Sequence, residues 1–300
     1  MTSKQWTTAL LLGLAASAGC EGDGPAREDE PAYAMTTDAP TIAEIDAAEW
    51  EALASRRIFF GHQSVGRDIM LGVQRVLKEH PEIGLRVVTS DDPSQVEGPA
   101  FIEARIGKNR EPETKANAFE AIVENGLADG SGAVAMLNYC YVDILPETDP
   151  DALFEDYARR IESLRQRHPE LLFVHITLPL HTAPEGLMER IRTRLGRNTQ
   201  TALNIKRNRY NDLLRERYEG VDPLFDLAKI QSTRADGTRA YTRYRGQNVY
   251  MLAPEWTYDG GHLNEEAQVR IAERFLAFLA RLPRTSGTGA RLADASSPAR

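Results

Sequence analysis

A carboxylate and an imidazole stand three residues apart near the end of the chain, in the segment YDGGHLN at residues 258–264. The two glycines favour a tight turn, in which Asp259 can accept a hydrogen bond from Nδ1 of His262. An imidazole held in this way has a fixed tautomer and can serve as a general base. The alternative is a plain turn in which Asp259 merely precedes two glycines. The pair indicates acid–base chemistry that needs a nucleophile from elsewhere.

Ser64 is the nucleophile candidate, in the segment FFGHQSVG at residues 59–66, where an apolar run gives way to a helical pattern. A serine becomes reactive when an imidazole takes its proton and N–H groups stabilise the oxyanion. The start of a helix supplies such donors and the positive end of its dipole. Ser64 could instead be a simple N-cap, but that would leave Asp259 and His262 unexplained. We therefore predict a catalytic triad of Ser64, His262 and Asp259.

Other polar residues are candidates for binding the oxyanion or the substrate. They are the backbone N–H of Gly107 and the side-chain amide of either Asn109 or Asn138. His62 either lines the site or bonds a loop carbonyl as a structural histidine. His62 and the triad's imidazole and carboxylate could in principle ligate zinc, but no His-x-x-x-His spacing supports a metal. We predict no metal and no other cofactor.

Three residues near these candidates receive no chemical role. Cys140 is expected to be a small buried apolar residue, because it lies in an apolar run. Asp143 is expected to brace a neighbouring loop. His181, after Pro179, is expected in a surface loop, and lining the rim of the site is the alternative.

Apolar runs of strand length alternate with helical patterns, which is typical of a parallel sheet with helices on both faces. Strands are expected at residues 57–60, 85–89, 133–137 (running on as far as 144), 171–178 and 224–227, and helices at 65–79, 114–127, 151–167, 199–218 and 265–282. Residues 90–113 are expected to form a loop. The prediction is one α/β domain with about five parallel strands, a flavodoxin-like three-layer sandwich. Ligands bind such sheets beyond the carboxyl ends of the strands, where the candidate residues would meet.

This order of motifs resembles the SGNH (GDSL-like) hydrolase superfamily over roughly residues 56–282. The Asp-x-x-His at 259–262 is the specific part. The family's Gly-Asp-Ser is replaced by Gly-His-Gln-Ser at 61–64, and Leu137-Asn138-Tyr139 stands in place of Gly-x-Asn-Asp. The resemblance implies a cofactor-free carboxylic ester hydrolase, with acyl or acetyl groups on carbohydrates or envelope glycans as substrates. The alternatives are an inactive glycan-binding lipoprotein and an O-acyltransferase that uses the same triad.

The N-terminus predicts export. Residues 1–20 contain a basic Lys4, an apolar run too short to span a bilayer, and Ser-Ala-Gly before Cys20. This resembles a bacterial lipoprotein signal, which implies lipidation of Cys20 and anchoring in the cell envelope. An ordinary signal peptide with a chance cysteine is the alternative. We expect an acidic tether at 21–45, the hydrolase-like domain at 46–283 and a disordered tail at 284–300.

Composition narrows the partners. The net charge of −8 argues against nucleic acid as a binding partner. Cys140 would be the one cysteine left beside Cys20, so no disulfide within the chain is expected and stability must come from the core. The expected partners are an ester substrate and, through the lipid, a membrane; a monomer is expected.

Overall fold

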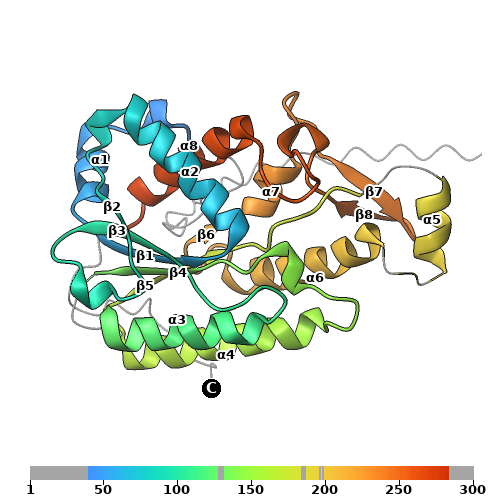
Figure 1. Cartoon of the computed structure of the whole chain (residues 1–300), viewed down its shortest axis with the longest axis horizontal. Helices are drawn as coiled ribbons and strands as arrows, with labels where there is room; N and C mark the ends of the chain where they lie inside the picture. The colour runs from blue at the N-terminus through green and yellow to red at the C-terminus, as the bar shows by residue number, and fades with distance from the viewer. Residues whose placement is uncertain (1–39, 128–131, 184–186, 196, 198, 284–300) are drawn as a thin grey trace, which may run out of the picture. The chain divides into compact units, whose positions relative to one another are not determined.

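The computed structural model describes residues 40–127, 132–183, 187–195, 197 and 199–283 (Figure 1). Its helices are α1 (Ala47–Ala54), α2 (Ser64–Glu79), α3 (Pro112–Gly126), α4 (Pro150–Arg167), α5 (Leu187–Arg194), α6 (Gln200–Tyr218), α7 (Leu227–Ser232) and α8 (Glu265–Ala280). The strands are β1 (Arg57–His62), β2 (Val87–Thr89), β3 (Ala100–Arg105), β4 (Val134–Leu137), β5 (Leu172–Ile176), β6 (Leu224–Phe225), β7 (Tyr241–Tyr244) and β8 (Gln247–Tyr250).

Strands β1 to β6 form one parallel sheet in the order β2-β3-β1-β4-β5-β6. Strand β1 therefore lies between β3 and β4. From β1 the chain first builds β2 and β3 on one side, and then crosses to β4, β5 and β6 on the other. This is a topological switch point, the place where open parallel sheets bind ligands beyond the carboxyl ends of their strands. The loops that follow β1, β3 and β4 are consequently neighbours at one edge.

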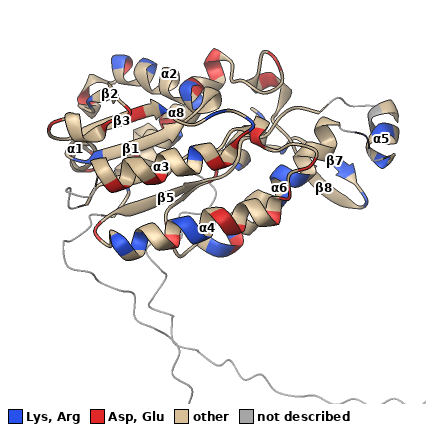
Figure 2. Cartoon of the chain, turned by 60° about the horizontal axis from the view of Figure 1, so that its bottom comes forward, with Lys and Arg blue, Asp and Glu red and all other residues tan. Residues whose placement is uncertain are grey.

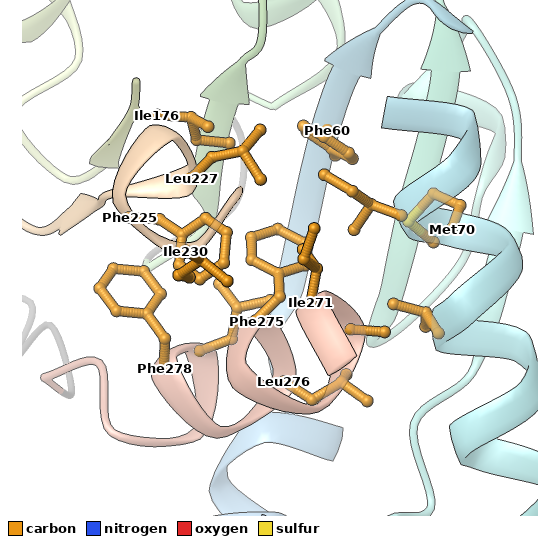
Figure 3. Close-up of a cluster of buried hydrophobic side chains, with 14 of the residues drawn as sticks. Phe60, Met70, Ile176, Phe225, Leu227, Ile230, Ile271, Phe275, Leu276 and Phe278 are labelled. Atoms are coloured by element: carbon orange, nitrogen blue, oxygen red, sulfur yellow. The ribbon is translucent and has the colours of Figure 1, made fainter. Parts of the chain in front are cut away.

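Each face of the sheet carries its own hydrophobic layer. One layer joins β1, β4 and β5 to α2 and α8, and includes Phe60, Phe225 and Phe275 (Figure 3). The other lies under α3, α4 and α6, and includes Phe59, Phe119 and Tyr210. Alternate residues of a strand point to opposite faces, so Phe59 and Phe60 serve different layers. This confirms the predicted α/β fold with helices on both faces.

The sheet has six strands rather than about five, because β3 lies inside the predicted loop 90–113. Its run AFIEAR holds Glu103 and Arg105, which interrupt the apolar pattern and concealed the strand. Helices α1, α5 and α7 and the antiparallel hairpin β7–β8 were not predicted either. No strand continues toward residue 144, since a 3-10 turn occupies Tyr141–Asp143.

The packed part of the chain begins before residue 46, because Ile45 belongs to the core and Ile42 packs against it. Cys20, the signal, most of the tether and the C-terminal tail lie outside the described residues. Among the helices that are described, none is both long and apolar enough to cross a membrane.

Candidate active site

Ser64 is the first residue of α2 and is separated from β1 by Gln63 alone, at the switch point of the sheet. Its hydroxyl Oγ lies 3.7 Å from Sγ of Cys140, which comes just after β4. The side chain of Gln63 donates through Nε2 to the carbonyls of Ile106 and Gly107, each at 2.8 Å. The turn that presents Ser64 is thereby tied to the loop after β3 and touches the loop after β4.

His262 and Asp259 form the expected pair. Asp259 Oδ2 accepts a hydrogen bond from Nδ1 of His262 at 2.6 Å. Asp259 Oδ1 accepts from the backbone N–H groups of Gly261 at 2.9 Å and His262 at 2.8 Å. Desolvation raises the pKa of Asp259, but the hydrogen bonds from the His262 side chain and from these backbone groups outweigh it and hold that pKa at about 2. The carboxylate is thus ionised and fixes the ring through Nδ1, which leaves Nε2 to act on a substrate or nucleophile.

Two consecutive residues link the nucleophile candidate to the histidine. Cys140 contacts Ser64, and the ring of Tyr141 packs edge-on against the ring of His262 with centroids 5.9 Å apart. A Cβ at Gly261 would lie 2.4 Å from Cζ of Tyr141, so only glycine permits this approach. The segment after β4 therefore bridges Ser64 and His262.

Helix α2 is joined directly to the histidine segment. Asp68, one turn after Ser64, accepts a hydrogen bond through Oδ2 from the backbone N–H of Leu263 at 3.0 Å. Burial raises the pKa of Asp68, and the Leu263 hydrogen bond and the nearby His262 oppose that rise. Farther along α2, a Cβ at Gly72 would lie 2.0 Å from the carbonyl oxygen of Gln268, so α2 and α8 pack backbone to backbone.

The predicted oxyanion donors differ in their surroundings. Asn138 is buried after β4, its backbone N–H bonds to Gly61 O, and its side-chain Nδ2 is buried without a hydrogen-bond partner among the described residues. Gly107 has φ +62°, and a Cβ there would lie 2.5 Å from the backbone nitrogen of Lys115. Asn109 is exposed and accepts from Nζ of Lys115 at 3.1 Å. Gly107 and Asn109 follow β3, not the strand expected at 85–89.

His62 has both ring nitrogens engaged. Nδ1 lies 2.9 Å from the carbonyl oxygen of Gln63, and Nε2 lies 2.8 Å from Oε2 of Glu103. The side chain is buried, and its Cβ would be 2.3 Å from a Cβ at Gly66 in the first turn of α2. This geometry fits the structural one of the two roles that we predicted, because no ring nitrogen is left for a substrate.

A buried ion pair joins the loops after β3 and β4; one partner, Asp143, was given no chemical role from the sequence, and the other, Lys115, was not singled out. Nζ of Lys115 and Oδ2 of Asp143 are 2.5 Å apart, and both side chains are fully buried. Asp143 also accepts from the backbone N–H groups of Cys140 at 2.7 Å and Arg110 at 2.9 Å. As expected, Asp143 braces a neighbouring loop: it ties the loop after β3 to the loop after β4.

His181 is half-buried beside the site rather than exposed in the surface loop that was expected. Its ring packs edge-on against Tyr141 at 5.3 Å, and Nδ1 lies 2.6 Å from the carbonyl oxygen of Thr182. Burial lowers the pKa of His181. The backbone N–H of Thr182 donates to Gly260 O at 2.8 Å, so the segment after β5 supports the turn between Asp259 and His262.

No protein-family model matches the chain, and no curated protein matches it in sequence. Solved structures do match it. An acetyl xylan esterase has a TM-score of 0.40 and 16% identity, covering 73% of this chain and 97% of its own. A lipolytic protein of the G-D-S-L family from Desulfitobacterium hafniense has a TM-score of 0.37 and 11% identity, covering 75% and 99%. A catalytic mutant of an acetylxylan esterase from Geobacillus stearothermophilus has a TM-score of 0.38 and 12% identity, covering 75% of this chain and 94% of its own. At these similarities the chemistry has to be inferred from the residues of the site.

Proposed function

We propose that this chain is a carboxylic ester hydrolase that uses Ser64, His262 and Asp259. The observation that carries the proposal is the Asp259–His262 pair, in which a carboxylate takes three hydrogen bonds from one turn and orients the ring. An imidazole oriented in this way, beside a helix that begins with serine, is the arrangement that acyl transfer requires.

In the proposed reaction, Ser64 Oγ attacks the ester carbonyl while Nε2 of His262 takes the hydroxyl proton. The protonated imidazole, stabilised by Asp259, then gives the proton to the departing alcohol oxygen. Water attacks the acyl-enzyme, with His262 again taking and returning a proton, and the carboxylic acid leaves. Each step conserves charge within the site and needs no cofactor.

The oxyanion needs donors that are in place before the reaction. The backbone N–H of Ser64 points out of the first turn of α2, where the helix leaves its first N–H groups unbonded. Asn138 supports this proposal because its buried amide nitrogen lacks a partner among the described residues. The loop at Gly107 is the third candidate. Asn109 fits the role less well, because its side-chain oxygen is held by Lys115.

We propose acyl or acetyl groups on carbohydrates as the substrate class. We also propose that the protein is exported and anchored to a membrane through a lipid on Cys20. The sequence before Cys20 supports the anchor. A Cys20→Ala variant should stay as an unprocessed precursor or be released in soluble form. A processed form of that variant that fractionates with the membrane as the wild type does, without detergent, would contradict the anchor.

The deciding experiment measures turnover of a short-chain ester and thermal unfolding on Ser64→Ala, His262→Ala and the double variant. We expect each single variant to lose about 10⁴-fold or more in kcat with little change in Tm, and the double variant to be barely worse, because the residues act as one unit. If Ser64 were only a helix cap, its loss would cost about 0.5–2 kcal/mol of stability and leave most turnover. A folded Ser64→Ala protein with its activity retained would overturn the proposal. Labelling by a fluorophosphonate should depend on both Ser64 and His262; its absence would point to a binding protein.

A further inference from the structure

Helix α5 exposes an apolar face. Leu187, Met188 and Ile191 lie on it, and Leu195 continues it through a hydrogen bond from its N–H to the carbonyl of Ile191 at 3.0 Å. Leu187 and Leu195 are each 69% exposed, and Met188 is 61% exposed. Elsewhere in the described chain, large exposed apolar side chains stand singly, so a cluster of them on one short helix marks an interaction surface.

The apolar side chains share one side of the helix. At about 100° per residue, Leu187, Met188, Ile191 and Leu195 fall within an arc of about 100°. Thr193 lies about 170° from the middle of that arc. It is the buried residue that faces the domain, where its Oγ1 lies 2.7 Å from Oγ1 of Thr199. The apolar arc therefore points away from the protein.

Arginines flank the arc on both sides. Arg192 lies about 40° beyond one edge and Arg194 about 20° beyond the other, and both are exposed. Figure 2 shows basic residues on α5 at the margin of the domain. Residues 187–197 contain four arginines and one glutamate, in a chain whose net charge is −8. This positively charged segment is complementary to a negatively charged partner, although the net charge of the whole chain is negative and would repel such a partner.

We propose that α5 docks on an anionic lipid bilayer, with the apolar arc inserted at the level of the headgroups. An apolar face bordered by arginines is how interfacial helices bind: the apolar side chains enter the acyl boundary and the arginines reach the phosphates. A folded acidic protein would match the arginines but would need a groove for the arc. A bilayer needs no such shape, and all four side chains of the arc are exposed, from 39% at Ile191 to 69% at Leu187 and Leu195.

The surface lies on the same side of the molecule as the proposed site. Helix α5 follows the segment after β5, in which Thr182 bonds to Gly260 and His181 packs on Tyr141. Figure 1 shows α5 beyond the end of α6, next to the hairpin β7–β8. Docking through α5 would thus hold the edge of the site close to the membrane surface. Docking of α5 on a bilayer would not require the triad.

Hydrogen exchange of the full chain tests the docking of α5 on a bilayer. The exchange is compared between phosphatidylglycerol vesicles, which are anionic, and phosphatidylcholine vesicles, which have no net charge. The readout is local, so an N-terminal segment that holds every variant at the vesicles does not obscure it. We expect the backbone amides of residues 187–195 to exchange at least about tenfold more slowly on phosphatidylglycerol vesicles, and at an unchanged rate on phosphatidylcholine vesicles. Leu187→Ser/Leu195→Ser and Arg192→Gln/Arg194→Gln should each abolish that protection.

Matched controls are Val221→Ser, which removes an apolar side chain that is 58% exposed elsewhere, and Lys78→Gln/Arg217→Gln, which removes the same charge from α2 and α6. Both should keep the protection. No protection on either lipid, or equal protection on both, would overturn the proposal. Protection that needs no vesicles and rises with protein concentration would also overturn it, and would assign the arc to a second copy of the chain.

Discussion

Asp68 Oδ2 and the backbone N–H of Leu263 are hydrogen-bonded at 3.0 Å, and this bond joins the helix that Ser64 begins to the residue after His262. Asp68 stands one helical turn after Ser64, so the bond restricts how far the proposed nucleophile and base can move apart. A misplacement of about 1 Å can cost on the order of 10²-fold in rate. We therefore assign Asp68 as a positioning residue.

Asp68→Ala should lower kcat by about 10- to 100-fold with little change in KM, because the Leu263 N–H loses its partner and the histidine segment shifts. The unsatisfied group should also cost about 1–3 kcal/mol of stability. Asp68→Asn keeps an acceptor oxygen and should restore most of kcat. Steady-state kinetics of the two variants decide the point: equal losses in both would show that the charge, not the hydrogen bond, matters.

The same pair of variants has a pH signature. Burial raises the pKa of Asp68, so the folded state holds its proton more tightly than the unfolded state, and the ionised carboxylate costs stability as pH rises. Asp68→Asn removes that cost. Its Tm relative to wild type should therefore be highest near neutral pH and should fall back as the solution is acidified.

The local part of the site was predictable from the sequence. Asp259 and His262 are three residues apart on one turn, so their hydrogen bond follows from short-range geometry. Ser64 could be placed because an apolar strand precedes it and a helix follows. Both inferences need only the spacing of neighbouring residues.

The parts that support the site were not predictable, because their roles come from contacts between distant segments. Asp68 and Leu263 are 195 residues apart, and Lys115 and Asp143 are 28 apart. Nothing near Lys115 in the sequence shows that α3 buries its amine. Strand β3 was missed for a similar reason: Glu103 sits in a strand because His62 and Thr89 bind its carboxylate, and both belong to other segments. Helix α5 was not predicted, although Leu187, Ile191 and Leu195 recur at helical spacing.

The buried pair of Lys115 and Asp143 should act as a clamp on the loops after β3 and β4. Removing one partner leaves an uncompensated buried charge, so Lys115→Met or Asp143→Asn alone should cost about 3–5 kcal/mol. The double variant removes both charges and keeps one carbonyl oxygen as an acceptor for one of the two backbone N–H groups, Cys140 or Arg110, which bind different oxygens of Asp143. We expect it to be more stable than either single variant, with kcat still reduced.

Chemical unfolding and kinetics on the three proteins separate the two roles. Recovery of stability without recovery of kcat supports the clamp, because the ion pair no longer ties the loop after β3 to the loop after β4. If kcat returned together with stability, the pair would be a purely structural element.

Asp259 gives a second pH prediction, of opposite sign to that of Asp68. Its pKa is held at about 2, below the ordinary value of 3.8, so the pair with His262 contributes stability that is fully present above about pH 4. That contribution should fade as pH drops from the unfolded value toward 2. The Tm difference between wild type and Asp259→Asn should be constant from neutral pH down to that range and shrink below it. A difference that already vanished at pH 6 would show that the carboxylate is not held in this way.

Asn138 allows a test in which catalysis and stability respond in different directions. Its Nδ2 is buried and has no partner among the described residues, which normally destabilises a fold. Asn138→Ala removes that unsatisfied group, so we expect Tm to stay level or rise. If the amide is the oxyanion donor, kcat should nevertheless fall by about 10²–10³-fold with KM little changed, since the donor acts only on the transition state.

Asn109→Ala is the matched control. The side-chain oxygen of Asn109 is already bonded to Lys115, so this variant should lose far less kcat. The assignment of Asn138 fails if Asn138→Ala keeps its turnover, or if Asn109→Ala shows the larger loss.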